Sequence, residues 1–268
     1  MENKRVLVIT QEMAPYLNGT EMSEVANELP QYFQNQGDEL RILMPRYGVI
    51  NERRHRLHEV VRLSGMNIII DEDDYPLIIK VASLPGSRLQ VYFLDNEDLF
   101  KRKFVFHDEK KQFFEDNAER MVFFCKAVLE TVKKFQWPPD IIHCHGWMTS
   151  LIPLYLKTAY KNEPVFANSK VVFSVYKDAN QEKLANTFMD KAPITESVTA
   201  DHLASFKNLD IDSMYKGGAD FADAIIVGSN EVDKDVIKHI KATKKPILEY
   251  TGKEEGYQEK YGSFYNSL

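Results

Sequence analysis

Cysteine and long apolar runs are scarce in this sequence. Its 268 residues include two cysteines, Cys125 and Cys144, too few for the framework of disulfides that holds small secreted domains together. No run approaches the roughly 18 apolar residues of a membrane span. The N-terminal MENKRVLVIT reaches a strand-like run without the apolar segment of a secretory signal. These absences predict no membrane partner and a cytoplasmic location.

An excess of positive charge is also absent. Lysine and arginine number 34 against 40 aspartates and glutamates, for a net charge of −6. Proteins that bind nucleic acid usually carry a basic surface, so nucleic acid is not an expected partner. The apolar content of 44% is ordinary for a globular protein and supports a packed core.

Short apolar runs alternate with stretches of helical spacing. The expected strands of this pattern are 5–10, 40–45, 88–96, 139–147, 170–176 and 224–229. The expected helices are 21–35, 108–135, 148–161, 212–223 and 230–242. Strands that are apolar throughout are typical of parallel sheets covered by helices. The sequence therefore predicts an α/β fold, a single Rossmann-like domain with a mostly parallel sheet and helices on both faces.

Two segments depart from this alternation. Residues 60–70 and 76–84 flank DEDDY and predict a β-hairpin excursion with an acidic tip, and residues 178–210 predict a loop-rich stretch. The domain is expected to span 1–245. Residues 246–268 form a polar and aromatic C-terminal tail, either docked or frayed.

The carboxyl ends of the strands are where an open α/β sheet binds ligands. In HCHGW, His143 and His145 share one face of a strand, and Cys144 takes the other. Two such histidines bind metal, donate hydrogen bonds to a ligand, or only satisfy backbone groups at the sheet edge. A zinc site needs further ligands, and no Cys or His cluster lies nearby in sequence, so neither a metal nor a cofactor is expected.

Two further segments have structural interpretations. The loop in QEMAPYLNGTEMSEVANELP (11–30) lacks the G-x-G-x-x-G and Walker spacings of phosphate loops. Asn18 is predicted to cap the following helix, with Glu21 as its capping-box partner. In DNAERM, Asp116 and Arg120 lie four residues apart, which predicts an ion pair on a helix.

Six segments together resemble the N-terminal half of bacterial starch and glycogen synthases. QEMAPYLNGTEMSEVANELP is similar to the family's S-E-x-A-P-F/Y-x-K-T-G-G-L-x-D-V, and RILMPRYGVI to its P-R-Y segment. VYFLDNEDLFKRK, DNAERMVFFCKAVLE, PDIIHCHGWMTSLIPLYLK and MYKGGADFADAIIVGSNEV are similar to four later family segments. Their order and spacing agree over residues 4–235.

This resemblance implies one half of a GT-B glycosyltransferase. The family transfers glucose from ADP-glucose to an α-1,4-glucan between two Rossmann-like domains, and the matching segments cover only the acceptor-side domain. The implied ligands are an α-glucan or a sugar nucleotide. The implied catalytic residues are His143, His145 and Asp116. The implied substrate-binding residues are Glu12, Asn18, Gly19, Trp147, Tyr176 and Arg120.

The departures from the family concern the nucleotide side. The family's K-T-G-G aligns with residues 18–21, so that Asn18 replaces the lysine and Glu21 a glycine. Gly146 replaces the aspartate of H-x-H-D-W, and Tyr176-Lys177 replaces a His-Asn pair. A carboxylate close to a partly desolvated diphosphate costs on the order of a few kcal/mol. This loop is therefore predicted to have lost its nucleotide chemistry.

Three functions remain open at this point. The first is a synthase whose C-terminal half comes from another chain. The second is a non-catalytic pseudoenzyme that binds glucan or a partner in glycogen metabolism, and the third is an enzyme with different chemistry on the same fold. The missing half and the lost lysine count against the first, so no glucosyl transfer by this chain alone is expected.

In the family that this chain resembles, the ends of the strands form a face that lies opposite the second domain, here called the cleft face. In this chain we expect the cleft face to bind a protein partner or a second copy of the chain. The apolar residues expected to be exposed there are Tyr16, Leu17, Met22, Trp147, Met148 and Tyr176. The expected polar rim is Glu12, His143, His145 and Lys177. In the alternative, the tail folds back and covers this face with Tyr257, Tyr261, Phe264 and Tyr265.

Overall fold

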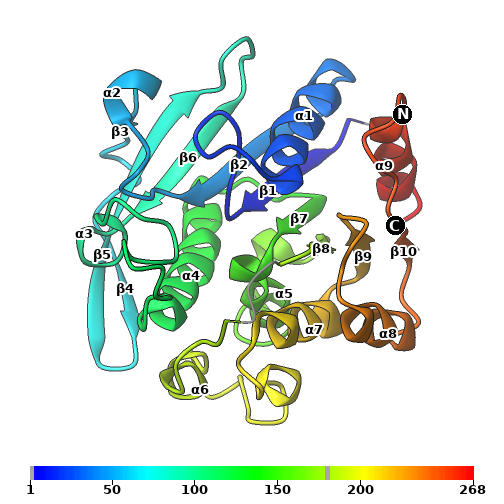
Figure 1. Ribbon diagram of the computed structural model, residues 1–268. Coiled ribbons are helices and arrows are strands. Elements are labelled where there is room, and N and C mark those ends of the chain that lie inside the picture. The colour runs from blue at the N-terminus through cyan, green and yellow to red at the C-terminus, as the bar shows by residue number, and fades with distance from the viewer. Residues whose placement is uncertain (1–2, 179–181) are drawn as a thin grey trace.

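A mostly parallel sheet runs through the molecule, as the computed structural model shows for residues 3–178 and 182–268 (Figure 1). Its strand order is β10-β9-β8-β7-β1-β2-β6-β5-β3, with β4 paired to β5 beside this path. The mutually parallel strands are β1 (Arg5–Thr10), β2 (Glu39–Pro45), β6 (Gln90–Asp95), β7 (Ile141–His145), β8 (Lys170–Val175), β9 (Ala224–Val227) and β10 (Ile247–Leu248). The predicted fold class is confirmed.

The antiparallel part of the sheet lies at the β6 edge. It consists of β3 (His58–Glu59), β4 (Met66–Ile70) and β5 (Asp73–Ser83). The strands β4 and β5 form a hairpin, as the two apolar runs around DEDDY predict.

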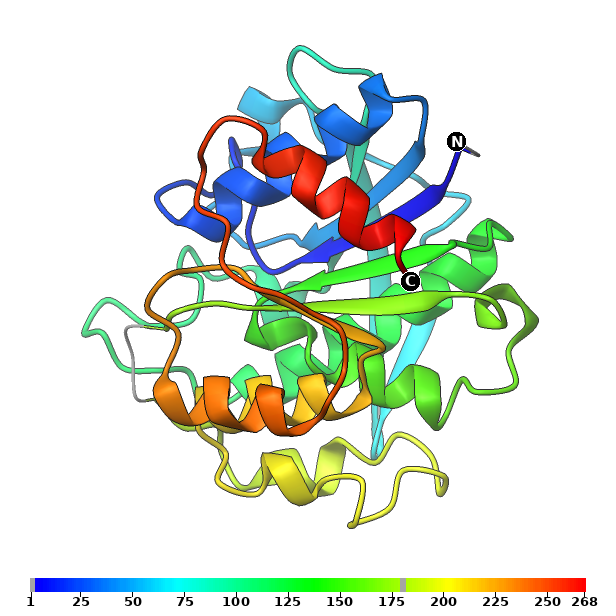
Figure 2. The same ribbon diagram turned by 90° about the vertical axis from the view of Figure 1, so that its right-hand side faces the viewer.

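Helices cover both faces of the sheet, which explains why the central strands are apolar on both sides. The α-helices are α1 (Glu21–Asn35), α2 (Glu52–His55), α3 (Glu97–Phe100), α4 (Asn117–Phe135), α5 (Leu151–Lys157), α6 (Thr187–Lys191), α7 (Ile211–Phe221), α8 (Lys234–Ala242) and α9 (Tyr257–Asn266). The 3-10 turns are η1 (Trp147–Thr149), η2 (Pro164–Phe166) and η3 (Ala204–Phe206). Both views place α1 and α9 together on one face, and α4, α5 and α7 on the other (Figures 1 and 2).

The first helix has a different cap from the predicted one. Thr20 is the N-cap residue of α1, because its hydroxyl accepts the backbone N–H of Ser23 at 3.0 Å. The Ser23 hydroxyl in turn accepts the N–H of Thr20. Asn18 instead donates its amide to the carbonyl of Pro15. The predicted Asn18–Glu21 capping box is therefore wrong.

The longest helix, α4, begins nine residues later than its pattern predicts, at Asn117 and not at residue 108. The Asp108 carboxylate accepts the backbone N–H groups of Lys110 and Gln112, which closes a turn. Lys111 has a φ of 62°, outside the right-handed helical region. These local bonds compete with the helix and delay its start.

The tail is docked on the rest of the chain. β10 pairs with β9, and α9 packs beside α1. Lys253 forms ion pairs with Glu24 at 2.7 Å and with Glu28 at 2.8 Å, and the Tyr257 hydroxyl donates to Glu28 at 2.6 Å. The predicted domain limit at residue 245 stays a prediction. Residues 179–181 of the expected loop-rich stretch lie outside the described residues.

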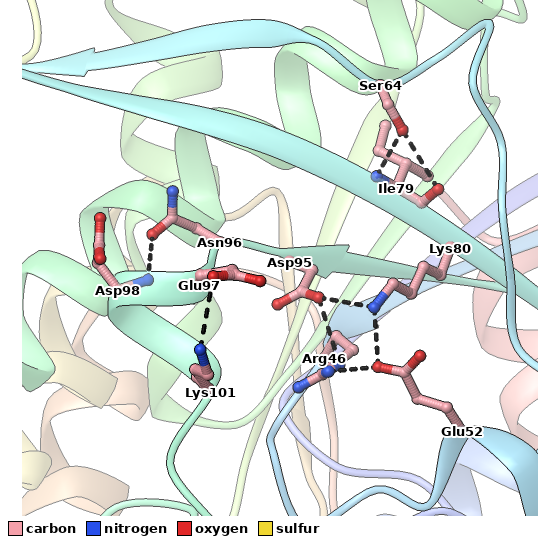
Figure 3. Close-up of polar contacts among 10 residues, drawn as sticks. All are labelled: Arg46, Glu52, Ser64, Ile79, Lys80, Asp95, Asn96, Glu97, Asp98 and Lys101. Carbon is pink, nitrogen blue, oxygen red and sulfur yellow. Dashed lines mark hydrogen bonds and ion pairs between the residues drawn. The ribbon is translucent and has the colours of Figure 1, made fainter.

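A group of four charged side chains, here called the ionic cluster, links the end of β2 to β5, β6 and α2 (Figure 3). It consists of Arg46, Glu52, Lys80 and Asp95. Lys80 Nζ lies 2.8 Å from Glu52 and 3.1 Å from Asp95, and Arg46 pairs with both carboxylates, at 3.2 Å in the case of Asp95. The two cations and two carboxylates balance each other in a largely buried place.

None of the helices in 3–178 and 182–268 combines the length and the apolar composition that crossing a membrane requires.

Candidate functional site

A cavity of about 400 Å³ opens at the carboxyl ends of the parallel strands. Its lining residues are Gln11, Glu12, Thr20, Glu21, Met22, Phe106, Trp147, Tyr176, Lys177, Asp178, Tyr215 and Ser229. The strands β1 and β7 are neighbours here, and the helices that follow them, α1 and α5, lie on opposite faces of the sheet. Such a switch point is where open α/β sheets bind ligands.

Glu12 follows β1 and places its carboxylate at the cavity. Its Oε1 accepts a hydrogen bond from the hydroxyl of Thr20 at 2.8 Å. Burial raises the pKa of Glu12, the bond from Thr20 lowers it, and the nearby Asp178 carboxylate raises it further. The structure thus places Glu12 at the cavity, and its predicted role in substrate binding stays a prediction.

The N-terminal end of α1 faces the cavity, and two of its backbone donors are already bonded within the helix cap. The N–H of Ser23 bonds to the Thr20 hydroxyl, and the N–H of Glu24 bonds to the Thr20 carbonyl at 3.3 Å. Glu21 places a carboxylate at the first turn of the helix. A phosphate would therefore meet a negative charge, and fewer available donors, at a helix end that in other proteins attracts anions.

Asn18 and Gly19 are exposed and are not among the residues that line the cavity. Gly19 has a φ of 108°, a left-handed conformation that side chains rarely adopt. Their predicted role in substrate binding stays a prediction, and the structure places them on the outer side of the loop before α1.

His143 and His145 lie side by side on β7, as the alternation of a strand predicts. Their ring centroids are 3.7 Å apart, and the two side chains are 0% and 1% exposed. They belong to a hydrogen-bonded group, here called the histidine cluster, whose members are His143, His145, Ser174, Tyr176 and Tyr265. The described cavity lining includes Tyr176 but neither histidine. Their catalytic role stays a prediction.

Each histidine of the cluster has neutral hydrogen-bond partners. His143 Nε2 lies 2.7 Å from the Ser174 hydroxyl, and its Nδ1 lies 2.5 Å from the Tyr265 hydroxyl. His145 Nδ1 lies 2.7 Å from the Tyr176 hydroxyl. Burial lowers the pKa of His145 to about 3, and burial with the neighbouring His145 lowers the pKa of His143 well below its ordinary value. Both rings are therefore neutral near pH 7.

The side chain of Gln11 occupies the space that a side chain at position 146 would need. Gly146 has a φ of 87°, and a Cβ added there would lie 2.4 Å from Gln11 Oε1. Gln11 accepts the backbone N–H of Met148 at 3.2 Å, which fixes its side chain in that place. In the family pattern a serine and an aspartate stand at these two positions. An aspartate at position 146 would therefore require the side chain of Gln11 to move.

Asp116 and Arg120 do not form the predicted ion pair with each other. Asp116 accepts two hydrogen bonds from Arg102, at 3.0 and 2.5 Å. Arg120 is fully buried and donates to the carbonyl of Val105 at 2.7 Å and to Asn117 at 2.6 Å. Burial lowers its pKa to about 10. Neither Asp116 nor Arg120 lines the cavity, so their predicted roles stay predictions.

The predicted exposed apolar patch is wrong. Five of its six residues are at most 6% exposed, and Leu17 is half-buried: Tyr16, Met22, Trp147, Met148 and Tyr176 are the buried ones. Two different segments supply the cover. Tyr265 of α9 packs edge-on against His143, whereas Phe106, from the loop before α4, packs against Trp147 at 4.9 Å. The tail therefore covers the histidine side of this face, and its Tyr250 hydroxyl also donates to Glu21 at the start of α1 at 2.7 Å.

Phe106 and Tyr215 are cavity residues that sequence reasoning missed. Phe106 comes from the loop before α4, and Tyr215 comes from the middle of α7. Neither follows a strand, so the rule that selects strand ends passes over them. Within residues 3–178 and 182–268, no group of three or more His, Cys, Asp or Glu side chains is arranged to hold a metal ion.

Comparison with known proteins identifies relatives over most of the chain. The family model described as the starch synthase catalytic domain matches residues 5–247. A glycogen synthase of Chlorobium luteolum is 36% identical over 238 residues, which are 88% of this chain and 48% of that protein. A glycogen synthase of Chlorobium chlorochromatii is 42% identical over 175 residues, 65% of this chain and 36% of that protein.

A solved structure shares the fold. The catalytic domain of starch synthase IV from Arabidopsis thaliana, bound to ADP and acarbose, superimposes with a TM-score of 0.74 at 19% identity. The match covers 93% of this chain and 51% of that chain. The chain spans about half the length of the curated relatives that it matches.

Proposed function

This chain belongs to the starch synthase catalytic domain family, and we propose that these 268 residues bind α-glucan without transferring glucose from ADP-glucose on their own. It is a glycosyltransferase domain of the glycogen and starch synthase type.

The charge of the cavity carries this proposal. Glu12, Glu21 and Asp178 place three carboxylates along its wall. Lys177 is the one cationic side chain in the described lining, and its Nζ pairs with Glu231. The diphosphate of a sugar nucleotide needs cations or free N–H groups to balance its charge. This cavity offers repulsion in their place, so ADP-glucose is not expected to bind productively.

The same lining suits a polyhydroxylated ligand. Trp147, Tyr176 and Tyr215 contribute aromatic surface, and the carboxylate of Glu12 and the amide of Gln11 contribute polar groups. Small-molecule sites commonly combine apolar walls with a few placed polar groups in this way. Glucan hydroxyls both donate and accept hydrogen bonds, and therefore match this mixture.

A pair of assays tests the proposal. The purified chain is incubated with radiolabelled ADP-glucose and glycogen, and we expect no label in glycogen above a buffer control. In parallel, the chain is sedimented with glycogen, and we expect it in the pellet. Label in glycogen contradicts the absence of transfer, and a chain that stays in the supernatant contradicts glucan binding.

A second candidate is a synthase assembled from two chains. It is favoured by Glu12, His143 and His145, which keep the residue types of the family pattern. Adding the separately expressed C-terminal half of the Chlorobium luteolum glycogen synthase to the transfer assay tests it. Label that appears only in the mixture supports the two-chain synthase, and its absence leaves glucan binding as the function.

A further inference from the structure

Two buried side chains that line the cavity each carry an N–H group with no hydrogen-bond partner among the described residues. Trp147 is 2% exposed and Gln11 is 5% exposed, and both line the cavity. The Gln11 Oε1 is used by the N–H of Met148, which identifies its Nε2 as the donor that remains. Within the described part of the chain, neither this Nε2 nor the indole N–H of Trp147 donates a hydrogen bond, and neither is enclosed by protein atoms. A ligand with acceptor oxygens would satisfy both donors.

Negative charge gathers near these donors. Glu12 and Asp178 both line the cavity, and the pKa of Glu12 is raised mainly by burial, with a smaller contribution from the repulsion by Asp178. Both carboxylates also act on Tyr215, which lines the same cavity. A ligand that places a positive charge near Glu12 removes this repulsion.

Aromatic rings complete the wall. Phe106, Trp147, Tyr176 and Tyr215 surround the polar groups. Aromatic faces attract ammonium groups and also pack against the apolar parts of other ligands. A bare metal ion would leave these rings unused, and an anion would meet the carboxylates.

We propose that this cavity takes a sugar unit that carries a protonated amino group in preference to the corresponding neutral sugar. The ring hydroxyls accept from Trp147 and Gln11, and the ammonium group donates to Glu12. This inference rests on the proposed function for the position of the sugar, and adds the chemical class that the position selects.

The two tryptophans provide an internal control for a binding experiment. The Trp137 indole N–H donates to Glu39 at 3.0 Å, and Trp137 does not line the cavity. The indole signals of the 15N-labelled chain are followed during titration with D-glucosamine, D-glucose and N-acetyl-D-glucosamine. We expect the Trp147 signal to shift and the Trp137 signal to stay, with glucosamine binding about tenfold tighter than the other two sugars, as one charge-assisted hydrogen bond provides.

A matched pair of variants assigns the preference to Glu12. In Glu12→Gln, the ratio of the glucose and glucosamine dissociation constants should fall from about ten to about one. In Glu196→Gln, which changes an exposed glutamate outside the cavity lining, the ratio should stay as it is.

Three results overturn the inference. They are equal affinity for the three sugars in the unmodified chain, an unmoved Trp147 signal, and a preference that survives in folded Glu12→Gln. The first two come from the unmodified chain and hold even where the variant does not fold. Sedimentation with glycogen but no preference for the amine would leave the proposed function standing. Glucosamine binding without sedimentation would instead leave the cavity assignment and contradict the glucan-binding function.

Discussion

The ionic cluster and the histidine cluster accommodate buried polar side chains in two different ways. The ionic cluster keeps four charges and pairs them, and its members lie between residues 46 and 95. The histidine cluster keeps no charge near pH 7, because its rings are neutral and their partners are hydroxyls. It also depends on distant sequence, since His143 and Tyr265 are 122 residues apart.

The pKa directions follow from this difference. Burial alone would raise the pKa of Glu52, but the hydrogen bonds from Lys80 and Arg46 hold it below its ordinary value. At Asp95, burial outweighs Arg46 and Lys80, and its pKa is raised. Around the histidines, no carboxylate of the described residues opposes the effect of burial, which therefore lowers both pKa values. Charge pairing keeps one cluster ionised, and proton loss makes the other neutral.

The largest expected effect comes from removing one charge of the ionic cluster. Asp95→Ala leaves Arg46 and Lys80 with Glu52 as their remaining partner in this cluster. Breaking a buried ion pair typically costs about 3 to 5 kcal/mol, because the remaining charge stays desolvated. Urea denaturation measures the change in the free energy of unfolding.

The control for this change is Asp98→Ala. Asp98 lies three residues further on, at the exposed first turn of α3 (Figure 3). Its replacement should alter the free energy of unfolding by no more than about 0.5 kcal/mol. Equal effects of the two substitutions would show that the pairing at Asp95 contributes nothing beyond that of a surface charge.

The fold follows from local sequence wherever one strand or helix decides its own limits. RVLVIT gives β1 at its predicted bounds, because a strand buried on both faces has a continuous apolar run, here Val6 to Ile9. The start of α4 could not be predicted in this way. Asp108 closes a turn before the helix, and the helical spacing of the apolar residues does not reveal that turn. Both Asn18 and Thr20 are good capping residues, and sequence alone did not decide between them.

The site was predictable to the level of strand ends. The two-residue period of a strand places His143 and His145 on one face, as found. Their burial could not be predicted, because it depends on Tyr265 from a tail without clear helical spacing. The electrostatic character of the cavity was partly visible, since Glu21 stands where the family pattern has a glycine.

A smaller expected effect is the loss of stability at acidic pH, in which the two clusters differ. Unfolded histidines bind protons below about pH 6.5, whereas the folded His145 does so only near pH 3. Stability is therefore lost as the pH falls below 6.5, by up to about 1.4 kcal/mol per pH unit for each buried histidine. Within the ionic cluster, Glu52 adds little between pH 6.5 and about 5, because its lowered pKa places its own loss of stability below its ordinary value of 4.5.

Two histidine variants test this assignment by urea denaturation at several pH values. His145→Gln should reduce the slope of the unfolding free energy against pH in this range by the contribution of one buried histidine, which is up to about 1.4 kcal/mol per pH unit. His58→Gln replaces an exposed histidine on β3 and should leave the slope as it is. A slope that His145→Gln does not change would mean that the acid sensitivity arises elsewhere.

The smallest of these effects tests whether the histidine cluster depends on the tail. Tyr265→Phe keeps the ring that packs on Phe33 and His143 but removes the hydroxyl 2.5 Å from His143 Nδ1. Leaving a buried polar atom without its partner lowers the free energy of unfolding by about 1 to 3 kcal/mol. Because the bond lost here is a single hydrogen bond between neutral groups, we expect a loss of about 1 to 2 kcal/mol. Tyr92→Phe is the matched control, because the Tyr92 hydroxyl bonds to Gln90 at an exposed place, and a loss below about 0.5 kcal/mol is expected there.

The same two tyrosine variants also test whether the histidine cluster holds α9 in place. If α9 is held by the histidine cluster, amide hydrogen exchange in 257–266 should quicken in Tyr265→Phe and stay unchanged in Tyr92→Phe, because local opening follows local stability. The ion pairs of Lys253 with Glu24 and Glu28 would still hold the start of the tail, so the quickening should be greatest toward Asn266. Uniform exchange along α9 in both variants would show that the carboxylates of α1, and not His143, fix this helix in place.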